Sequence, residues 1–349
     1  MSNNNNKMQY VRLGNTGMKV SRICLGGLSF GSSRSFDWIK DEKESIELIG
    51  KAYEAGINFF DTANIYSNGE SERVLGKAVH YHKMSRSRIV VATKLFFPVM
   101  PNVEDFAPSR QQLENDSFNG SFINDWGLSR KHIMDAIEDT LKRLQLDYID
   151  ILQIHRLDPH TTMEETMETL HDLIKAGKVR YIGASSMPTW QFQKANNVAE
   201  KNGWTPFTCM TNFYNLLYRE EEREMIPYCA DQKIAVIPWS PLAMGLLTGG
   251  GKGRNTLRSE QTNQVFGDQL YDETIAGRVE ELASKKNVKP AQIALAWLYS
   301  KPYITAPIVG IGNEQHLVDA VGALNIKLTE EETKFLEECY SPRPAHYLT

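Results

Sequence analysis

Short apolar runs alternate with longer amphipathic stretches along almost the whole chain. Eight of these runs are rich in β-branched and aromatic residues, which predicts eight buried strands. The predicted strands are Ile23–Gly27, Ile57–Phe60, Ile89–Thr93, Tyr148–Ile154, Arg180–Ala184, Phe207–Thr211, Ile234–Pro238 and Ala306–Val309.

The stretches between these runs have the spacing of helices. In one of them, Ile133, Ile137 and Leu141 recur on a single stripe, and Ser129 ahead of them is a residue type that favours a helix start. The predicted helices are Asp41–Ala55, Glu70–His80, Ser129–Leu144, Thr162–Ala176, Thr189–Lys201, Glu220–Asp231, two within Asp272–Ser300 separated at Asn287–Pro290, Glu314–Ala323 and Glu330–Glu338.

Eight strand–helix units favour a closed parallel barrel of the α/β class, the (β/α)8 or TIM barrel, because strands this apolar must be covered on both faces. A doubly wound open sheet is the alternative. Such a sheet usually carries a Gly-x-Gly-x-x-Gly turn after its first strand, whereas Gly26 to Gly31 reads Gly-Gly-Leu-Ser-Phe-Gly. Residues 11–20 have the pattern of a hairpin around Gly14–Gly17, and we expect this hairpin to plug the bottom of the barrel.

The length of 349 residues is compatible with one barrel, because α/β barrels of about 250 residues and more form single domains. We expect residues 1–8 to be a disordered polar N-terminus and residues 9–349 to form one barrel domain. Two connections, residues 96–127 and 246–271, are unusually long, and long loops in compact domains are commonly functional.

Composition narrows the classes of function. The chain has 39 Lys and Arg against 43 Asp and Glu, so its net charge of −4 provides no field that recruits nucleic acid or an anionic membrane. Its four cysteines are far apart, which indicates free thiols in a reducing compartment rather than a zinc cluster. The polar first residues and the absence of a long apolar run argue against a signal peptide or a membrane span. We therefore expect a cytoplasmic protein with no nucleic-acid, membrane or metal partner.

Polar residues of particular types follow the predicted strands. Asp61, Lys94 and His155 end the second, third and fourth strands, and Tyr66 lies shortly beyond Asp61. The carboxyl ends of barrel strands meet at one rim, so these four side chains should converge. Each alone has an ordinary structural explanation, but together they suit proton donation to a carbonyl oxygen. Tyrosine would be the acid, the ammonium and carboxylate would adjust its pKa, and a neutral histidine would orient the carbonyl.

The same residues lie in motifs that resemble those of the aldo-keto reductases. Gly56 to Tyr66 reads Gly-Ile-Asn-Phe-Phe-Asp-Thr-Ala-Asn-Ile-Tyr, and Gly-Glu-Ser-Glu follows from Gly69. The later blocks are Asp147–His155, Lys178–Ser186 and Pro238–Leu242. The resemblance extends from about Val11 to Glu338. The block Asn215–Glu221 is most similar to the branch of fungal aryl-alcohol dehydrogenases and versiconal hemiacetal acetate reductases.

The resemblance implies a barrel that binds NADP(H) without a Rossmann fold and reversibly reduces aldehydes or ketones to alcohols. It implies that Tyr66 is the proton donor, that Lys94 and Asp61 adjust its acidity, and that His155 orients the carbonyl. The cofactor-binding positions that it implies are Gly27, Leu28, Asp61, Ser185, Ser186, Thr211, Trp239, Ser240, Pro241, Leu242, Met244, Gly245, Arg254, Gly310, Gly312, Gln315, His316 and Asp319.

Some positions depart from the family pattern. Ser186 replaces a common Asn, Thr211 a common Gln and Met244 a common Arg. The segment from residue 310 to 316 lacks the basic residue that often pairs with the 2′-phosphate of NADPH, so NADH stays open as a cofactor. A replacement charge could come from protonated His316 or from the long loop, which contains Lys252, Arg254 and Arg258.

Aromatic residues in the predicted rim loops indicate a pocket for an aromatic or apolar carbonyl substrate. The candidate pocket residues are Phe30, Trp38, Phe97, Trp126 and Tyr214. We expect a monomer or weak homodimer that acts on a small carbonyl or alcohol. A nicotinamide-sensing regulatory subunit with little turnover, like the potassium-channel β subunits that resemble this family, is the alternative. A barrel acting on phosphorylated sugars is a third reading, against which the aromatic Trp239 argues.

Overall fold

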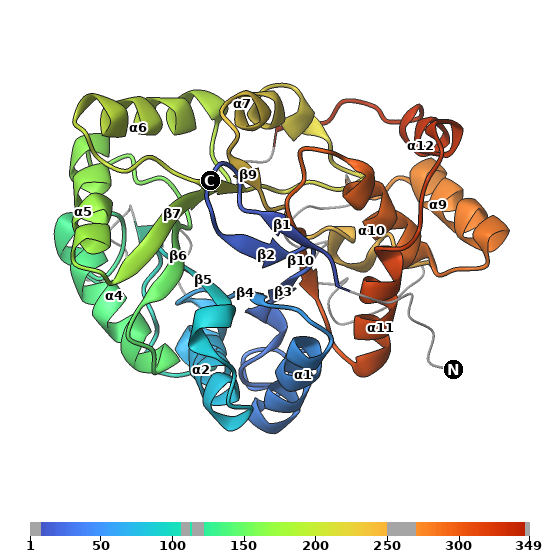
Figure 1. The fold of residues 1–349 in the computed structure, drawn as a ribbon. Coiled ribbons are helices and arrows are strands. Elements are labelled where there is room, and N and C mark those ends of the chain that lie inside the picture. The colour runs from blue at the N-terminus through green and yellow to red at the C-terminus, as the bar shows by residue number, and fades with distance from the viewer. Residues whose placement is uncertain (1–7, 106–111, 114–121, 250–269, 346–349) are drawn as a thin grey trace.

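The computed structural model describes residues 8–105, 112–113, 122–249 and 270–345. It confirms the parallel barrel: eight strands form one sheet in the order β10-β3-β4-β5-β6-β7-β8-β9, with helices arranged around it (Figure 1). Its strands are β3 (Cys24–Gly26), β4 (Phe59–Asp61), β5 (Val90–Leu95), β6 (Ile149–Ile154), β7 (Val179–Ser185), β8 (Cys209–Thr211), β9 (Ala235–Val236) and β10 (Ile308–Gly310).

Backbone hydrogen bonds join the two ends of this sheet. The amide of Thr305 donates to the carbonyl of Val236 at 2.9 Å, and the amide of Ile308 donates to that of Pro238 at 2.8 Å. The first and last strands of the sheet therefore meet, which removes the exposed edges that an open sheet would have.

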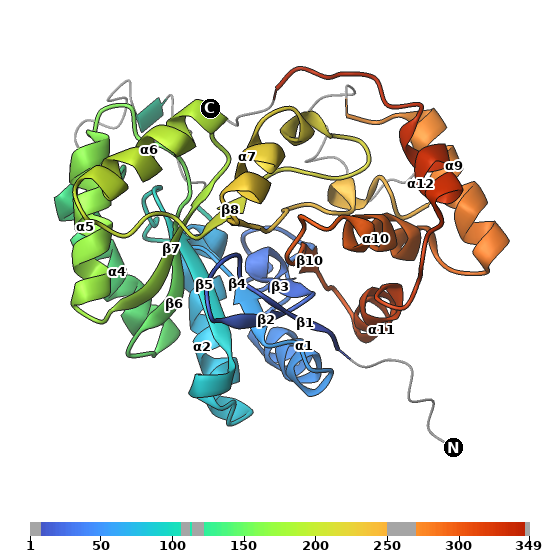
Figure 2. The ribbon, with the colours of Figure 1, turned by 45° about the horizontal axis from the view of Figure 1, so that its top comes forward.

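Helices cover the outer face of the barrel where the sequence pattern predicts them. They are α1 (Glu42–Glu54), α2 (Glu70–Tyr81), α4 (Arg130–Leu144), α5 (Met163–Lys175), α6 (Thr189–Lys201), α7 (Met225–Asp231), α9 (Glu273–Lys286), α10 (Pro290–Ser300), α11 (Glu314–Ala323) and α12 (Glu330–Glu337). The Ser129 side chain accepts a hydrogen bond from the His132 amide and so caps α4. Helices α9 and α12 pack together outside the ring, beyond α10 (Figure 2). None of the described helices has the length and apolar character of a membrane span.

One predicted helix differs from the structure. We expected a single helix over Glu220–Asp231, but the chain forms a short 3-10 turn at Glu220–Glu222 and then α7. Pro227 explains the break, because it has no amide hydrogen for a bond to Arg223 and is tolerated only in the first turn of a helix. The structure accordingly starts α7 at Met225, which puts Pro227 in its first turn.

The hairpin closes the amino-terminal end of the barrel. Strands β1 (Tyr10–Arg12) and β2 (Lys19–Ser21) pair in antiparallel fashion, and Figure 1 looks onto the end that they cover. Leu13 is fully buried in a cluster of residues inside the barrel. Gly14 has φ +53°, and a Cβ atom there would lie 2.6 Å from the carbonyl oxygen of Lys233, so the turn fits against the barrel only as glycine. Met8, which we expected in the disordered N-terminus, is buried.

The inside of the barrel changes from apolar to polar toward the carboxyl ends of the strands. Its apolar layer is small and fully buried, and it consists of Leu13, Val20, Cys24, Phe59, Val90, Ala92, Ile151, Cys209, Ala235, Ile237 and Ala306. Side chains of a strand alternate between its two faces, so the residue two positions after each of these faces inward as well. At those positions lie Asp61 after Phe59, Lys94 after Ala92 and Thr211 after Cys209. The strand register thus gathers polar groups at one end of the barrel.

Removing the plug should weaken the whole barrel. We expect Leu13→Ala to lower the free energy of unfolding by about 2–5 kcal/mol, because it leaves a cavity in a cluster that includes residues of several strands. The measurement is urea unfolding followed by tryptophan fluorescence. Val11→Ala, in the same hairpin at a partly exposed position, is the matched control and should cost clearly less. Equal losses for the two variants would contradict the role of Leu13 as a plug.

Candidate active site

The four residues that we expected to converge lie together at the carboxyl ends of neighbouring strands. The ammonium of Lys94 donates to Asp61 Oδ2 at 2.5 Å and to the carbonyl oxygen of Thr62 at 3.0 Å. The same ammonium lies 3.5 Å from the hydroxyl of Tyr66. The rings of Tyr66 and His155 meet edge to face with centroids 6.0 Å apart. The Lys94 ammonium therefore lies beside the Tyr66 hydroxyl, and the His155 ring contacts the Tyr66 ring.

The loop that carries Tyr66 is tied to the base of the loop after β5. The Asn64 amide group donates to the carbonyl oxygen of Phe97 at 2.9 Å, and that of Asn68 donates to the carbonyl oxygens of Asn102 and Asp105 at 2.9 and 2.7 Å. Asn68 has φ +48°, a left-handed conformation that is uncommon outside glycine but that asparagine tolerates. The side-chain amides of Asn64 and Asn68 therefore hold the loop of Tyr66 against the segment that follows β5.

Lys94 and Asp61 form a buried ion pair, and both side chains are only 2% exposed. Burial acts to lower the pKa of Lys94, but the charge of Asp61 and the adjacent Tyr66 outweigh it and hold this pKa above its usual value. Burial raises the pKa of Asp61, while the Lys94 ammonium and a hydrogen bond from Gln153 act in the opposite direction. Lys94 therefore carries its positive charge beside Tyr66 at neutral pH.

Tyr66 and His155 are both uncharged at neutral pH. Burial raises the pKa of Tyr66, and the charge of Lys94 offsets only part of this rise, so the hydroxyl retains its proton. Burial, with the charges of Arg156 and Lys94, holds the pKa of His155 well below its ordinary value. Among the described residues the buried Nδ1 atom of His155 has no hydrogen-bond partner. The site thus offers a protonated hydroxyl, a neutral imidazole and a nearby ammonium.

Several hydroxyl groups and an indole ring lie next to these residues on β7, β8 and the segment after β9. The Ser185 hydroxyl donates to the carbonyl oxygen of Thr211 at 3.1 Å. The indole nitrogen of Trp239 donates to the Ser186 hydroxyl at 3.0 Å, and the indole ring stacks on Phe213 with centroids 4.5 Å apart. The orientation of the Trp239 ring is therefore fixed both by a hydrogen bond and by stacking.

The loop after Trp239 has an unusual backbone. Ser240, Ala243 and Met244 have φ values of +51°, +47° and +55°, and Gly245 has +102°. The amides of Ala243 and Gly245 donate to the carbonyl oxygens of Ser240 and Leu242 at 2.9 and 3.0 Å, so these residues form successive tight turns. Strain of this kind in residues other than glycine is concentrated at ligand sites.

The side chains at the start of α11 contact one another. Asn313 caps the helix through the His316 amide at 2.9 Å, and His316 Nδ1 accepts from the Gly312 amide at 3.4 Å. Asp319 accepts hydrogen bonds from Gln315 at 2.9 Å and from Lys289, the N-cap residue of α10, at 2.8 Å. Lys289 is therefore a cation near this end that the sequence pattern did not indicate.

Some predicted cofactor-binding positions lie outside the described residues, and at others the structure shows only how the residue packs against its neighbours. Lys252, Arg254 and Arg258 belong to the part of the chain that the structure does not describe. Gly27 lies so near β4 that a Cβ atom would be 2.8 Å from the carbonyl oxygen of Asp61. Of the remaining cofactor candidates, Leu28 and Gly310 are exposed, Leu242 is partly exposed and Pro241 is buried.

The predicted pocket residues do not form one group. The Phe97 ring meets the His155 ring edge to face at 5.7 Å, and Trp126 meets Phe96 in the same way at 5.9 Å. Trp38 stacks on Phe36 at 5.8 Å, and Phe30 is buried. Of the five predicted pocket residues, Phe97 is the one with a described ring contact to the four converging residues.

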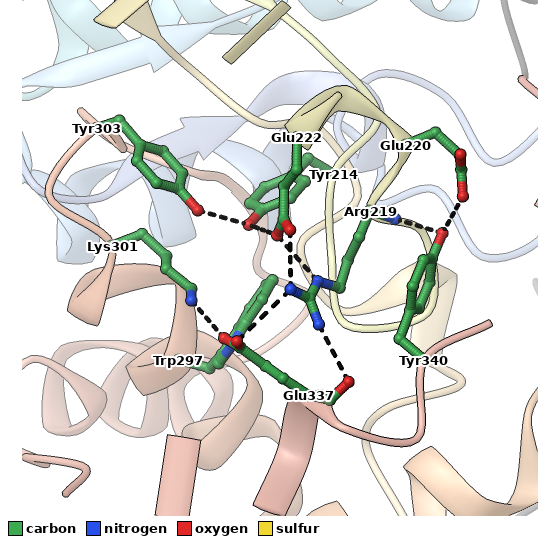
Figure 3. A network of polar contacts seen from close by, with 9 residues as sticks. All are labelled: Tyr214, Arg219, Glu220, Glu222, Trp297, Lys301, Tyr303, Glu337 and Tyr340. Carbon is green, nitrogen blue, oxygen red and sulfur yellow. Dashed lines mark hydrogen bonds and ion pairs between the residues drawn. The ribbon is translucent and has the colours of Figure 1, made fainter. Parts of the chain in front are cut away.

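Tyr214 lies in a buried polar network (Figure 3). Its hydroxyl donates to Glu222 at 2.6 Å and lies 3.1 Å from the hydroxyl of Tyr303. Glu222 also binds the Arg219 guanidinium at 2.9 and 2.8 Å, and this guanidinium lies over the rings of Trp297 and Tyr340. The network joins the segment after β8 to α10, α12 and the C-terminal segment. Tyr214 is fully buried there and presents no surface to a pocket. The prediction failed because the position of a residue in a rim loop does not fix the direction of its side chain.

Sequence reasoning missed one side chain at the centre of the site, Gln153. It donates to Asp61 Oδ1 at 3.3 Å and accepts from the Thr211 hydroxyl at 2.5 Å. A signal was present, because Gln153 is one of two polar residues in a buried strand, with Asp150, and lies two positions before His155 on the inward face. A buried polar side chain in a strand needs hydrogen-bond partners, so Gln153 could have been predicted to bind other polar groups of the site.

The neutral His155 should make stability depend on pH. In the unfolded chain histidine titrates near 6.5, whereas in the folded protein its pKa lies well below this value. As pH falls from about 6.5 to 5 the unfolded state binds the extra proton, so the free energy of unfolding should fall. Burial raises the pKa of Glu221 to about 8, and this group acts in the opposite direction. The quantity to measure is therefore the difference in free energy of unfolding between wild type and His155→Gln. This difference should shift against the wild type as pH falls, and a constant difference would contradict a buried neutral His155.

Comparison with known proteins agrees with this geometry. The model of the Aldo/keto reductase family matches residues 22–341. Versiconal hemiacetal acetate reductase of Aspergillus parasiticus is 45% identical over 345 residues, which cover 97% of this chain and 99% of that protein. A Schizosaccharomyces pombe protein, named provisionally as an aryl-alcohol dehydrogenase, is 48% identical over 343 residues and 96% of each chain. Aldo-keto reductase AMT2 of Alternaria alternata is 43% identical over 340 residues, 96% of this chain and 92% of that protein. The chain belongs to the aldo/keto reductase family of oxidoreductases.

Proposed function

We propose that the protein is an NADP(H)-dependent oxidoreductase that reduces aldehydes or ketones to alcohols, with Tyr66 as the proton donor. The observation that carries the proposal is the protonated Tyr66 hydroxyl, which lies 3.5 Å from a buried ammonium and next to a neutral imidazole. A hydroxyl acid with a fixed positive charge beside it suits protonation of a carbonyl oxygen that is gaining negative charge.

The proton transfer follows from these residues. Tyr66 gives its proton to the carbonyl oxygen, and the resulting phenolate is stabilised by the Lys94 ammonium. Asp61, with its carboxylate 2.5 Å from Lys94, keeps that ammonium charged and in place. In the reverse direction, alcohol oxidation, the phenolate accepts the proton, so oxidation should be favoured at higher pH than reduction.

His155 orients the substrate in this proposal. Its Nδ1 atom is buried without a described partner, so a proton on Nε2 leaves only a lone pair unsatisfied and avoids a buried unpaired donor. The Nε2 hydrogen can then bind the carbonyl oxygen together with the Tyr66 hydroxyl. A neutral imidazole donates a hydrogen bond without competing with Tyr66 for the role of acid.

The residues present fit a nicotinamide cofactor, which supplies the hydride when bound. Trp239, oriented by Ser186 and Phe213, provides a flat surface for the nicotinamide ring. Ser185 and Ser186 offer hydroxyl groups for the carboxamide, and Thr211, which is fully buried, supports Ser185 through its carbonyl oxygen. The segment from Ser240 to Gly245, which follows Trp239 and contains several residues with positive φ, is the proposed site of the pyrophosphate.

In this proposal the adenosine end of the cofactor is bound by Gly310, Gly312, Gln315, His316 and Asp319. A 2′-phosphate needs positive charge, which His316 would supply when protonated and which the long loop would supply through Arg254. Lys289 forms an ion pair with Asp319 at 2.8 Å, which reduces the repulsion between that carboxylate and a phosphate. We propose NADPH as the preferred cofactor, with NADH as the second choice.

The substrate that we propose is an aromatic or apolar carbonyl compound. Phe97 forms an apolar wall beside His155, and Trp126 lies behind it against Phe96. The relatives named as aryl-alcohol dehydrogenases support the same class of substrate. We further propose that the protein acts in the cytoplasm as a monomer or weak homodimer of one domain. Its free thiols, three of them buried, fit a reducing compartment.

Replacing the proton donor tests the assignment of roles. Tyr66→Phe should lower kcat for carbonyl reduction by at least about 100-fold and leave NADPH affinity nearly unchanged, because only the hydroxyl is lost. Lys94→Met should be similarly inactive, whereas Asp61→Asn should lose less, because it removes support rather than the proton. Steady-state kinetics with an aromatic aldehyde measures all three variants. A Tyr66→Phe enzyme with wild-type kcat would contradict the assignment of the acid.

Titration with each cofactor tests the second part of the proposal. NADPH should quench the intrinsic tryptophan fluorescence through Trp239, and NADH should bind at least about tenfold more weakly, a difference of about 1.4 kcal/mol. Trp239→Phe is the control that identifies the reporter. Equal affinity for the two cofactors would contradict the proposed preference. Tight binding without measurable turnover of any carbonyl would favour the regulatory-subunit alternative.

A further inference from the structure

A continuous line of buried side chains links the ion pair of the site to the cofactor-facing end of β8. Asp61 uses one carboxylate oxygen for Lys94 and the other for the Gln153 amide group. The amide oxygen of Gln153 accepts from the Thr211 hydroxyl at 2.5 Å. Gln153 is 1% exposed and Thr211 is fully buried, so water does not compete for these bonds.

The path from Gln153 to Thr211 passes over the intervening strand β7. In the sheet Gln153 on β6 is paired with Gly183 on β7, which is paired with Cys209 on β8. A Cβ atom at Gly183 would lie 2.3 Å from the Cys209 sulfur and 3.3 Å from Cγ of Gln153. The missing side chain at Gly183 therefore leaves the space in which Gln153 reaches from β6 across to β8.

The partners fix the orientation of the Gln153 amide. A carboxylate can only accept hydrogen bonds, so the NH2 group of Gln153 must face Asp61 and its oxygen must face Thr211. The Thr211 hydroxyl is then the donor in its bond to Gln153. The backbone carbonyl of Thr211 meanwhile accepts from the Ser185 hydroxyl and the Ser186 amide, both at 3.1 Å.

From this geometry we infer that Gln153 is a positioning residue, which couples the residues that hold the nicotinamide carboxamide to the Asp61–Lys94 ion pair. This inference rests on the proposed function. Gln153 holds Asp61 so that its second oxygen faces Lys94, and it holds Thr211, whose backbone carbonyl oxygen in turn accepts from the Ser185 hydroxyl and the Ser186 amide. Cofactor binding and the placement of the ammonium beside Tyr66 then depend on one shared side chain.

A double-variant cycle on the cofactor-free protein tests whether the relay exists. Gln153→Met keeps the size of the side chain but removes both bonds, and it should lower the melting temperature by roughly 2–5 °C. Thr211→Val removes one of the same bonds. Adding Thr211→Val to Gln153→Met should cost nothing more and can restore stability, because it deletes a hydroxyl left without an acceptor. Losses that simply add in the double variant would overturn the relay.

Binding and kinetics test the coupling. Gln153→Met should weaken NADPH binding, measured by tryptophan quenching, and lower kcat by about 10- to 100-fold while leaving KM for the carbonyl unchanged. Thr211→Val should weaken both in the same direction, and Thr211→Ser, which keeps the hydroxyl, should lose clearly less than Thr211→Val. Thr169→Val is the matched control: it removes a buried hydroxyl on α5 that bonds only to the Glu165 carbonyl oxygen, and it should leave both quantities unchanged.

The outcomes separate the two proposals. Wild-type NADPH affinity and kcat in a folded Gln153→Met protein would overturn the positioning role. If Gln153→Met does not fold, the Thr211→Val and Thr211→Ser pair decides the question, since equal kcat in these two variants would also overturn it. Failure of the wild type to bind NADPH or to reduce carbonyls would instead overturn the proposed function, and the melting-temperature cycle would still decide whether the relay exists.

Discussion

The buried ion pair between Lys94 and Asp61 is the interaction on which the rest of the site depends. Removing two charges from water is costly, and their mutual attraction offsets this cost only when the remaining hydrogen-bonding positions are also satisfied. Here the ammonium has Asp61, the carbonyl oxygen of Thr62 and the Tyr66 hydroxyl around it, and the carboxylate has Gln153 as its second partner. The cost of burial thus requires a set of neighbours in fixed positions, and these neighbours form the site.

The barrel supplies those positions through strand register. Lys94 and Gln153 are directly paired on neighbouring strands, and Gly26 is paired with Asp61 on the other side. Small residues below them, such as Ala92 and Cys209, fill the apolar layer that the hairpin closes from beneath with Leu13. This apolar layer lowers the local dielectric constant, which strengthens the electrostatic effect of the Lys94 ammonium on Tyr66.

Much of the fold and of the site could be predicted because local rules decide them. The strands, most helices and the cap at Ser129 appear where periodicity and capping chemistry predict them. The residues Tyr66, Asp61, Lys94 and His155 could be grouped because strand ends meet at one rim. Pro227 broke a predicted helix by a rule that is also local, so that difference could have been foreseen. The burial of Tyr214 could not have been foreseen, because the direction of its side chain depends on contacts with Glu222, Tyr303 and Trp297 that form only in the folded chain.

The order of the strands and helices, the closed parallel barrel and the motifs that carry the four converging residues can be inferred from the amino-acid sequence. These properties follow from hydrophobic periodicity and from residue types at strand ends, both of which are local. The folded barrel is needed to see that Gln153 reaches across Gly183 to Thr211, that Lys289 contacts Asp319, and that burial leaves Tyr66 protonated and His155 neutral. Such features depend on distances between residues far apart in the chain and on exclusion of water, and neither exists until the barrel closes.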